Sequence, residues 1–331
     1  DHRDLHSFPT RRSSDLFNYT LNARWALVQS ARNNPNPVWH GYLRFLFICV
    51  LALFLRGAVL ASLVQEYHWA PQVAILAGVA GAAIVNFIGT AFFVFPRTGA
   101  RATQAIRWRI LAISVASYML VLRWFFSGIV ELMPQESYYW VYSQHLDYGY
   151  LDHPPMVAWL VWVGTWLLGK EEAAVRLPAA ICWIITAFFI FRLTANQYGK
   201  TAAFRSVMLL SVLPIYTVVG IMMTPDAPLF AAWAGSLYFL DRSLVARQSK
   251  AWWGVGACLG LGILSKYTIA LLGPTTLLFI LFHRPSRCWM KRPQPYLAAL
   301  VALSLFMPVI VWNANHGWAS FEFQGSRRWS G

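Results

Sequence analysis

Long apolar runs alternate with short polar segments along most of this chain. Several runs hold about 20 residues, which is the length that an α-helix needs to cross a hydrocarbon core about 30 Å thick. Only 12% of the residues are charged, against about 25% in soluble domains, and no series of short alternating strands suggests a membrane barrel. We therefore predict an all-α, polytopic membrane bundle, with apolar runs near residues 43–64, 72–95, 110–130, 155–169, 178–195, 206–222, 227–241, 251–265, 268–282 and 296–312.

Basic residues gather between the apolar runs and give the chain a net charge of +14. Short cytoplasmic loops of membrane proteins are enriched in Lys and Arg, so these clusters predict which helix ends face the cytoplasm. Topology explains the positive charge, and no nucleic acid is expected as a partner. The predicted cytoplasmic segments are Arg24–Arg44, Arg97–Arg109, Arg192–Arg205, Arg242–Lys250 and Arg284–Arg292.

One apolar run, 155–169, is not expected to cross the membrane. If it and the run 178–195 both crossed, the basic segments before and after them would face opposite sides. The run is also short for a crossing, and it is rich in tryptophan, which is enriched at membrane interfaces. We predict that 155–169 lies along the outer membrane surface and that the other nine runs cross.

Under this topology, nine of the ten acidic residues after position 16 face outward. Carboxylates beside a membrane are costly to place and commonly mark chemistry or an ion path. They are densest in Glu131–Pro155, ELMPQESYYWVYSQHLDYGYLDHPP, which also holds two histidines and several tyrosines. We therefore expect the functional site in this loop. The outward acids are Glu66, Glu131, Glu136, Asp147, Asp152, Glu171, Glu172, Asp226 and Glu322.

The first 16 residues differ in character from the rest. Residues 6–16, HSFPTRRSSDL, correspond to one reading frame of a widely used DNA-sequencing adapter, so we expect residues 1–16 to be an artefact outside the fold. The remaining sequence starts abruptly at Phe17 and stops abruptly at Gly331, which suggests an internal fragment of a longer protein. The four cysteines include no CxxC pair, so neither a zinc ribbon nor a disulfide framework is expected.

Residues 17–96 form the first predicted membrane domain. FNYTLNARWALV (17–28) and VNFIGTAFFVFP (85–96) share an apolar stretch, an asparagine and an aromatic end. The segment resembles the GtrA-like membrane domain, a four-helix unit associated with polyprenyl-linked sugars, of which about two and a half helices would be present. The alternative is an ordinary helical hairpin in which Asn22 and Asn86 bond neighbouring helices.

Residues 97–331 form the second predicted domain, and its motifs begin with QESYYWVYSQHLDYGYLDHPP in the outer loop. This segment resembles the first outer loop of the glycosyltransferase family 39-like proteins, the protein O-mannosyltransferase and aminoarabinose-transferase group with the GT-C fold. The resemblance implies a bundle with outer juxtamembrane helices, truncated at its C-terminal side. Further matches are GKEEAAVRLPAA (169–180), MTPDAPLF (223–230), GLGILSKYT (260–268) and PVIVWNANHGWASFEF (308–323).

The resemblance implies sugar transfer from a lipid phosphate to an acceptor hydroxyl, with inversion at the anomeric carbon. Such a reaction needs a carboxylate to take the acceptor proton and cations to hold the departing phosphate. The implied catalytic carboxylates are Glu136, Asp152 and Asp226, and the implied phosphate ligands are Lys266, His153 and Arg176. Glu136 is the first choice for the base or acceptor-orienting carboxylate. Members of the group often have Asp-Glu where this chain has Gln135-Glu136. If the family's Asp is the base, Gln135 cannot serve, and Glu136 or Asp152 must substitute.

Each of these residues has a structural alternative. Asp152 and Asp226 could each cap the helix that follows, because Asp is a strong N-cap residue. Glu136 could be a solvated charge on a surface helix, and Lys266 could extend to the membrane interface without binding a ligand. No cofactor is certain. The resemblance leaves a divalent metal ion at Asp152 open, although one Asp-His pair does not fill a coordination shell.

We predict an enzyme of the inner (plasma) membrane that uses a polyprenyl-phosphate sugar and an acceptor lipid, glycan or protein. The alternative is a non-enzymatic flippase or transporter of the lipid-linked sugar. Transporters place ionisable groups near mid-membrane within repeated halves, whereas this chain crowds its charges at one face and shows no repeat. The sugar and the acceptor do not follow from the sequence.

Overall fold

The computed structural model describes residues 38–94 and 104–326, and all of the secondary structure in these ranges is helical. The expected artefact at 1–16 and the segment 17–28 lie outside the described residues. The chain divides into two compact units, Asp1–Thr103 and Gln104–Gly331, and each is described by itself. The predicted all-α, multi-pass membrane fold is confirmed.

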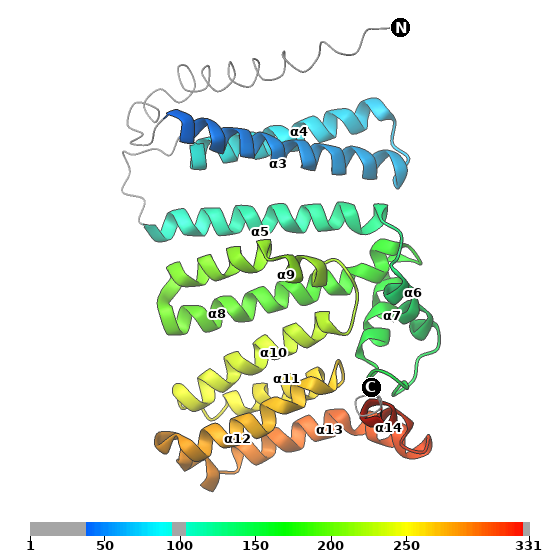
Figure 1. The fold of residues 1–331 in the computed structure, drawn as a ribbon, viewed down its shortest axis with the longest axis vertical. Helices are drawn as coiled ribbons and strands as arrows, with labels where there is room; N and C mark the ends of the chain where they lie inside the picture. Colours follow the sequence, from blue (N-terminus) through cyan, green and yellow to red (C-terminus); the bar gives the residue numbers. More distant parts are fainter. Residues whose placement is uncertain (1–37, 95–103, 327–331) are drawn as a thin grey trace. The chain divides into compact units, whose positions relative to one another are not determined.

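The first unit contains a pair of helices, α3 (Val38–Gln65) and α4 (Pro71–Gly89), followed by a π-helical turn η2 (Thr90–Val94). Figure 1 shows α3 and α4 lying side by side. Glycines on α4 allow this close packing, because a Cβ at Gly78 would lie 3.2 Å from the Arg56 carbonyl oxygen and one at Gly89 would clash with Ile48.

The second unit packs its long helices in chain order, so that α5 contacts α8, α8 contacts α10, α10 contacts α11 and α11 contacts α13. Short helices α6 and α7 sit together at one end of these long helices, and α14 lies at the same end (Figure 1). The elements are α5 (Gln104–Ile129), α6 (Pro134–Gln144), α7 (Met156–Leu168), α8 (Glu172–Val212), α9 (Pro214–Val219), α10 (Asp226–Leu240), η3 (Asp241–Val245), α11 (Ala251–Ile263), η4 (Tyr267–Leu271), α12 (Leu272–Phe282), η5 (Arg284–Lys291), α13 (Gln294–Asn315) and α14 (Ala319–Ser326).

Helix α8 is two helices rather than one rod. Gly199 has φ 83° and ψ 169°, which is outside the helical region and favours glycine, and the ribbon doubles back at this point (Figure 1). The two arms correspond to the predicted runs near 178–195 and 206–222. The turn between them lies within the basic segment Arg192–Arg205, as the charge pattern requires.

Fewer helices have a full membrane length than the nine predicted crossings. Within the described ranges, five helices are long and apolar enough to cross, or six if the bent pair Tyr267–Phe282 and Arg284–Lys291 counts as one span. The number differs for two reasons. The arms of α8 are counted together, and α10 and α11 hold only 15 and 13 residues.

Helix α7 corresponds to the run predicted to lie on the membrane surface. It has 13 residues, which is too short to span a bilayer. One face, including Val157 and Val161, is fully buried in a cluster with residues of α6, α8 and α10. Gly164 brings α7 against α8, because a Cβ there would meet the Ala174 carbonyl oxygen at 2.2 Å. This packing fixes the loop between α6 and α7.

Candidate active site

Glu136 and Arg176 form a buried ion pair between α6 and α8. Arg176 Nε donates to Glu136 Oε1 at 2.9 Å, and Arg176 Nη2 donates to Glu136 Oε2 at 2.6 Å. The Glu136 carboxylate also accepts the backbone N–H groups of Met133 and Met223, each at 3.1 Å. Glu136 is 0% exposed, so the alternative of a solvated surface charge is wrong. The carboxylate joins α6 to α8 and to the segment before α10.

The Arg176 guanidinium has no N–H group left for a ligand. Its five N–H donors match five acceptors, because the remaining three bonds reach backbone carbonyls. Nη1 donates to Ser127 and Val130 at 2.8 and 2.6 Å, and Nη2 donates to Glu131 at 2.9 Å. The predicted roles of Arg176 as a phosphate ligand and of Glu136 as the base therefore find no support in this geometry. Both residues hold the end of α5.

Asp152 lies in the loop before α7 and accepts a hydrogen bond from α6. Tyr142 Oη donates to Asp152 Oδ1 at 2.8 Å, and the Tyr138 and Tyr142 hydroxyls share a short hydrogen bond. Tyr150 stacks on Tyr142 with ring centroids 4.1 Å apart. The side chain of Asp152 is 20% exposed, so it is supported on one side and accessible on the other.

Asp152 does not cap the following helix. Pro155 occupies the N-cap position of α7, and no side chain caps that helix end. The structural alternative for Asp152 is therefore wrong, and the carboxylate is held by tyrosine instead. Burial and hydrogen bonds to Tyr138 and Asp152 raise the pKa of Tyr142 above its ordinary value, so this phenol stays protonated and can donate.

His153 follows Asp152 and is about 24% exposed. Its Nε2 atom lies 4.0 Å from Asp152 Oδ2, and its ring meets the Tyr139 ring edge-on at 5.8 Å. Burial lowers the pKa of His153, with Asp152 and Asp226 opposing the shift and Lys266 contributing to it. The imidazole is therefore neutral at pH 7. As a phosphate ligand it would donate a hydrogen bond and carry no charge.

Asp226 and Lys266 form a second, more open ion pair. Lys266 Nζ donates to Asp226 Oδ1 at 2.8 Å, and the two side chains are 34% and 39% exposed. Asp226 is the first residue of α10, but the N-cap position is Pro225 and no side chain caps this helix. The capping alternative for Asp226 is thus wrong. Lys266 has an extended backbone between α11 and η4, which turns it toward α10.

Asp152 and the Asp226–Lys266 ion pair lie at the same end of the second unit. Met156 N donates to the Leu264 carbonyl oxygen at 3.0 Å, which joins the start of α7 to the chain just before Lys266. The charges of Asp152, Asp226 and Lys266 all affect the pKa of His153, although burial has the largest effect. Three segments far apart in sequence therefore place two carboxylates, one ammonium and one imidazole at the same end of the second unit.

The C-terminal helices cover the loop beside Asp152. Gln324 Nε2 on α14 donates to the Asp152 backbone carbonyl at 2.5 Å. Trp312 Nε1 on α13 donates to Asp147 Oδ2 at 2.9 Å, and a Cβ at Gly149 would clash with the Trp312 ring. These contacts hold the segment from Asp147 to Asp152 against α13 and α14.

A metal centre gains no support. Among residues 38–94 and 104–326, no three His, Cys, Asp or Glu side chains gather as they would around a metal ion. The Asp152 carboxylate accepts a hydrogen bond from Tyr142 and lies 4.0 Å from His153 Nε2, which is not a complete set of metal ligands. The divalent metal ion at Asp152 therefore remains a prediction, for which the described residues provide no coordination shell.

The sequence did not reveal the partners of Asp152. Tyr142 and Gln324 are the residues that hold its carboxylate and its backbone. The spacing of Tyr138 and Tyr142, four residues apart on a helix, places both on one face and was the available signal. Gln324 is 172 positions away from Asp152, and no local pattern connects them.

Comparison with known proteins finds similarity in both parts of the chain. Residues 152–312 match the model of the dolichyl-phosphate-mannose-protein mannosyltransferase family, and residues 13–95 match the GtrA/DPMS transmembrane domain. Residues 152–312 of the second unit are thus similar to this mannosyltransferase family. The predicted resemblance to GT-C glycosyltransferases behind a GtrA-like domain is confirmed. The GtrA/DPMS match begins inside the segment 1–16.

Several curated proteins are similar to about half to two thirds of the chain. The lipid A galacturonosyltransferase RgtD of Rhizobium johnstonii is 27% identical over 193 residues, 56% of this chain and 39% of the relative. An undecaprenyl phosphate-alpha-4-amino-4-deoxy-L-arabinose arabinosyl transferase of Photorhabdus laumondii is 22% identical over 178 residues, 52% of this chain and 32% of the relative.

The lipopolysaccharide core galacturonosyltransferase RgtA of Rhizobium johnstonii is 27% identical over 230 residues, 67% of this chain and 45% of the relative. The chain spans less than half the length of these three curated relatives. No solved structure matches the chain at a significant level.

Proposed function

We propose that this protein is a membrane glycosyltransferase that moves a sugar from a polyprenyl-phosphate donor to an acceptor hydroxyl. The observation that carries the proposal is that Asp152 and the Asp226–Lys266 pair lie at the same end of the second unit, where Met156 N bonds the Leu264 carbonyl oxygen. The family match and the names of the relatives, which include an undecaprenyl-phosphate-dependent transferase, support the same reaction class.

Asp152 is the proposed general base. In this reaction the acceptor oxygen forms a bond to the anomeric carbon, and the bond from that carbon to the phosphate oxygen breaks. The electron pair of the broken bond stays on the polyprenyl phosphate, and the acceptor proton passes to Asp152. Attack from the face opposite the phosphate inverts the anomeric centre. Tyr142 holds the carboxylate in position for this transfer.

Lys266 is the proposed ligand of the donor phosphate. Negative charge builds on the phosphate as the glycosidic bond breaks, and an ammonium group stabilises that charge. Asp226 orients Lys266 through the 2.8 Å ion pair and prevents it from extending freely into solvent. The neutral His153 would add a hydrogen bond to the same phosphate. Glu136 and Arg176 act as structural supports.

The same proposal places the reaction on the periplasmic side of the inner membrane. The basic segments near Gly199, η3 and η5 lie at the helix ends away from Asp152, and short basic loops favour the cytoplasm. The GtrA/DPMS domain would present the lipid-linked sugar. The acceptor class stays open among lipid, glycan and protein, and the relatives named for lipid A and lipopolysaccharide favour a glycolipid.

Reconstitution of the full chain in proteoliposomes tests the proposal against the flippase alternative. Undecaprenyl-phosphate aminoarabinose and the galacturonic acid analogue are supplied with lipid A, and mass spectrometry detects the covalent product. We expect a glycosylated acceptor from wild type and from Glu171→Gln, an exposed carboxylate at the same end, but not from Asp152→Asn. Movement of donor between leaflets with no product from any variant would contradict an enzyme.

A further inference from the structure

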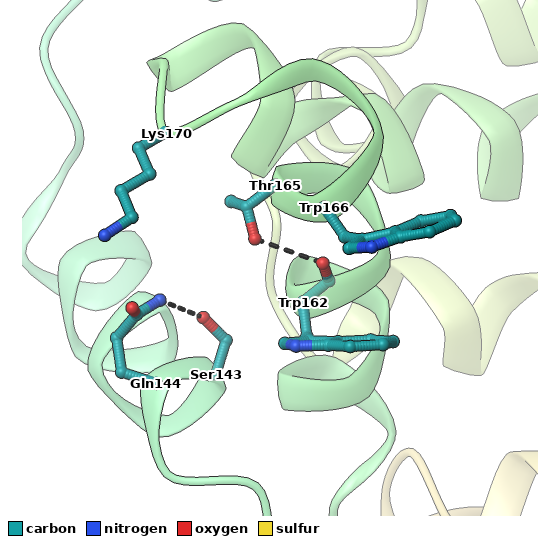
Figure 2. A pocket seen from close by; sticks show the side chains of 6 residues that line it. All are labelled: Ser143, Gln144, Trp162, Thr165, Trp166 and Lys170. Atoms are coloured by element: carbon teal, nitrogen blue, oxygen red, sulfur yellow. Dashed lines mark hydrogen bonds between the residues drawn. The ribbon is translucent and has the colours of Figure 1, made fainter.

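The second unit has a hollow between α6 and α7 that the proposed reaction does not use. Its volume is about 240 Å³, and Figure 2 shows its lining side chains. Among the described residues, none of these side chains is hydrogen-bonded to Asp152, His153, Asp226 or Lys266. The lining residues are Ser143, Gln144, Trp162, Thr165, Trp166 and Lys170.

One side of the hollow is a pair of indole rings. Trp162 and Trp166 lie one turn apart on α7, with ring centroids 6.3 Å apart and planes inclined by 15°. They are 43% and 71% exposed, and Leu167 beside them is 57% exposed. A short helix that exposes tryptophan and leucine in this way suits the membrane interface, where indole rings sit at the level of the headgroups.

The other side of the hollow is polar and cationic. Gly169, with φ 91°, reverses the chain after α7, and Lys170 then extends across the opening toward Gln144 (Figure 2). Lys170 forms no hydrogen bond or ion pair with another residue in the described part of the chain. Gln144 uses one donor on Ser143, at 3.2 Å, which leaves its carbonyl oxygen and second N–H group for a ligand.

We propose that this hollow binds the headgroup of an anionic phospholipid of the outer leaflet, with phosphatidylglycerol as the matching chemistry. Lys170 would pair with the phosphate, and Gln144 and Thr165 would bond the glycerol hydroxyls. Trp166 and Leu167 would contact the upper acyl chains. A soluble sugar phosphate would use the polar side alone and leave the exposed apolar side in water, so the amphipathic lining favours a lipid.

The bound lipid would stabilise the contact between α6 and α7. Its headgroup would bridge Gln144 at the end of α6 to Lys170 after α7. Helix α6 also carries Tyr142, whose hydroxyl holds Asp152. The lipid site would therefore support the proposed active site without contacting the substrate.

Native mass spectrometry of the full chain, released from nanodiscs of stated composition, tests the proposal. The discs contain phosphatidylcholine alone, phosphatidylcholine with phosphatidylglycerol, or phosphatidylcholine with undecaprenyl phosphate. We expect wild type to retain phosphatidylglycerol about tenfold more tightly than Lys170→Gln, since one charge-assisted contact is lost. Trp166→Ala should also weaken retention, because the apolar contact with the acyl chains is lost. Lys170→Arg restores retention, and Lys200→Gln, beside the distant turn at Gly199, behaves as wild type.

Equal retention of phosphatidylglycerol by wild type and Lys170→Gln would overturn the proposal. So would equal retention of phosphatidylcholine and phosphatidylglycerol by wild type. If Lys170→Gln loses undecaprenyl phosphate instead, the hollow belongs to the donor and the phospholipid assignment is wrong. Asp152→Asn should lose sugar transfer but retain phosphatidylglycerol as wild type does, whereas Lys170→Gln should lose phosphatidylglycerol. Failure of the proposed reaction and failure of the lipid site therefore give different results.

Discussion

Arg176 and Glu136 show how burial changes the meaning of a charged residue. The sequence placed both in the outer loop region and supplied the chemistry of a phosphate ligand and a base. It could not show that every Arg176 N–H group is matched by a protein acceptor, because those acceptors are mostly backbone carbonyls at the end of α5. Every residue type has a backbone carbonyl, so the sequence does not indicate which carbonyls accept these hydrogen bonds.

Glu136→Gln is expected to destabilise the fold before it affects chemistry. The substitution leaves the Arg176 charge buried without its carboxylate, which typically lowers the free energy of unfolding by about 3–5 kcal/mol. The unfolding transition of the detergent-solubilised chain measures this loss. A variant that unfolds like wild type but no longer transfers sugar would restore Glu136 as a catalytic candidate.

Tyr142→Phe should lower turnover while leaving the fold intact. The hydroxyl orients the Asp152 carboxylate, and loss of a hydrogen bond to a charged group corresponds to about tenfold in rate. We expect kcat to fall and the KM for the donor to stay within about twofold. Tyr150→Phe, which removes a hydroxyl that bonds only backbone groups, is the matched control. A Tyr142→Phe enzyme with wild-type kcat would contradict the positioning role.

His153 gives the stability of the protein a pH dependence. Burial lowers its pKa in the folded state, so below about pH 6.5, the ordinary value for histidine, the unfolded chain binds more protons than the folded chain. The unfolding temperature should be constant above this pH and should fall as the pH drops through the folded-state pKa of His153. In His153→Gln, the unfolding temperature should fall less over the same acidic range. An unchanged fall in the variant would show that another group controls it.

At the level of elements, the charge pattern was more informative than hydropathy. It predicted that 155–169 lies at the surface, and the structure gives α7 only 13 residues there. Hydropathy gave ten apolar runs, of which nine were still predicted to cross, because it cannot show that α10 ends after 15 residues or that Gly199 joins two arms of α8. Helix lengths at these points depend on tertiary packing, which an apolar run does not specify.

Gly164 provides a test of the α7–α8 contact that supports the active-site loop. A methyl group there would meet the Ala174 carbonyl oxygen at 2.2 Å, so Gly164→Ala must push the helices apart. We expect a loss of about 1–3 kcal/mol in the free energy of unfolding, measured in detergent. Gly273→Ala, which meets nothing within 4 Å, is the control. Equal stability of the two variants would refute the close packing.

For the whole molecule, the sequence predicted the all-α membrane class and the resemblance to both families. Lys266 and Asp226 were recognised because each stood in a motif at the same predicted face, and the structure pairs them at 2.8 Å. The sequence did not predict which residues of different motifs contact each other. Contacts such as Gln324 with the Asp152 backbone depend on the chain returning after 172 positions.

Single-turnover sugar transfer by the full chain in proteoliposomes tests the proposed active site most directly. Wild type, Asp152→Asn and Lys266→Gln are compared with undecaprenyl-phosphate aminoarabinose as donor and lipid A as acceptor. We expect Asp152→Asn to lower the rate at least about 100-fold, and Lys266→Gln to lower it while weakening donor binding. Rates for both variants within about twofold of wild type would contradict a reaction centre built from Asp152 and Lys266.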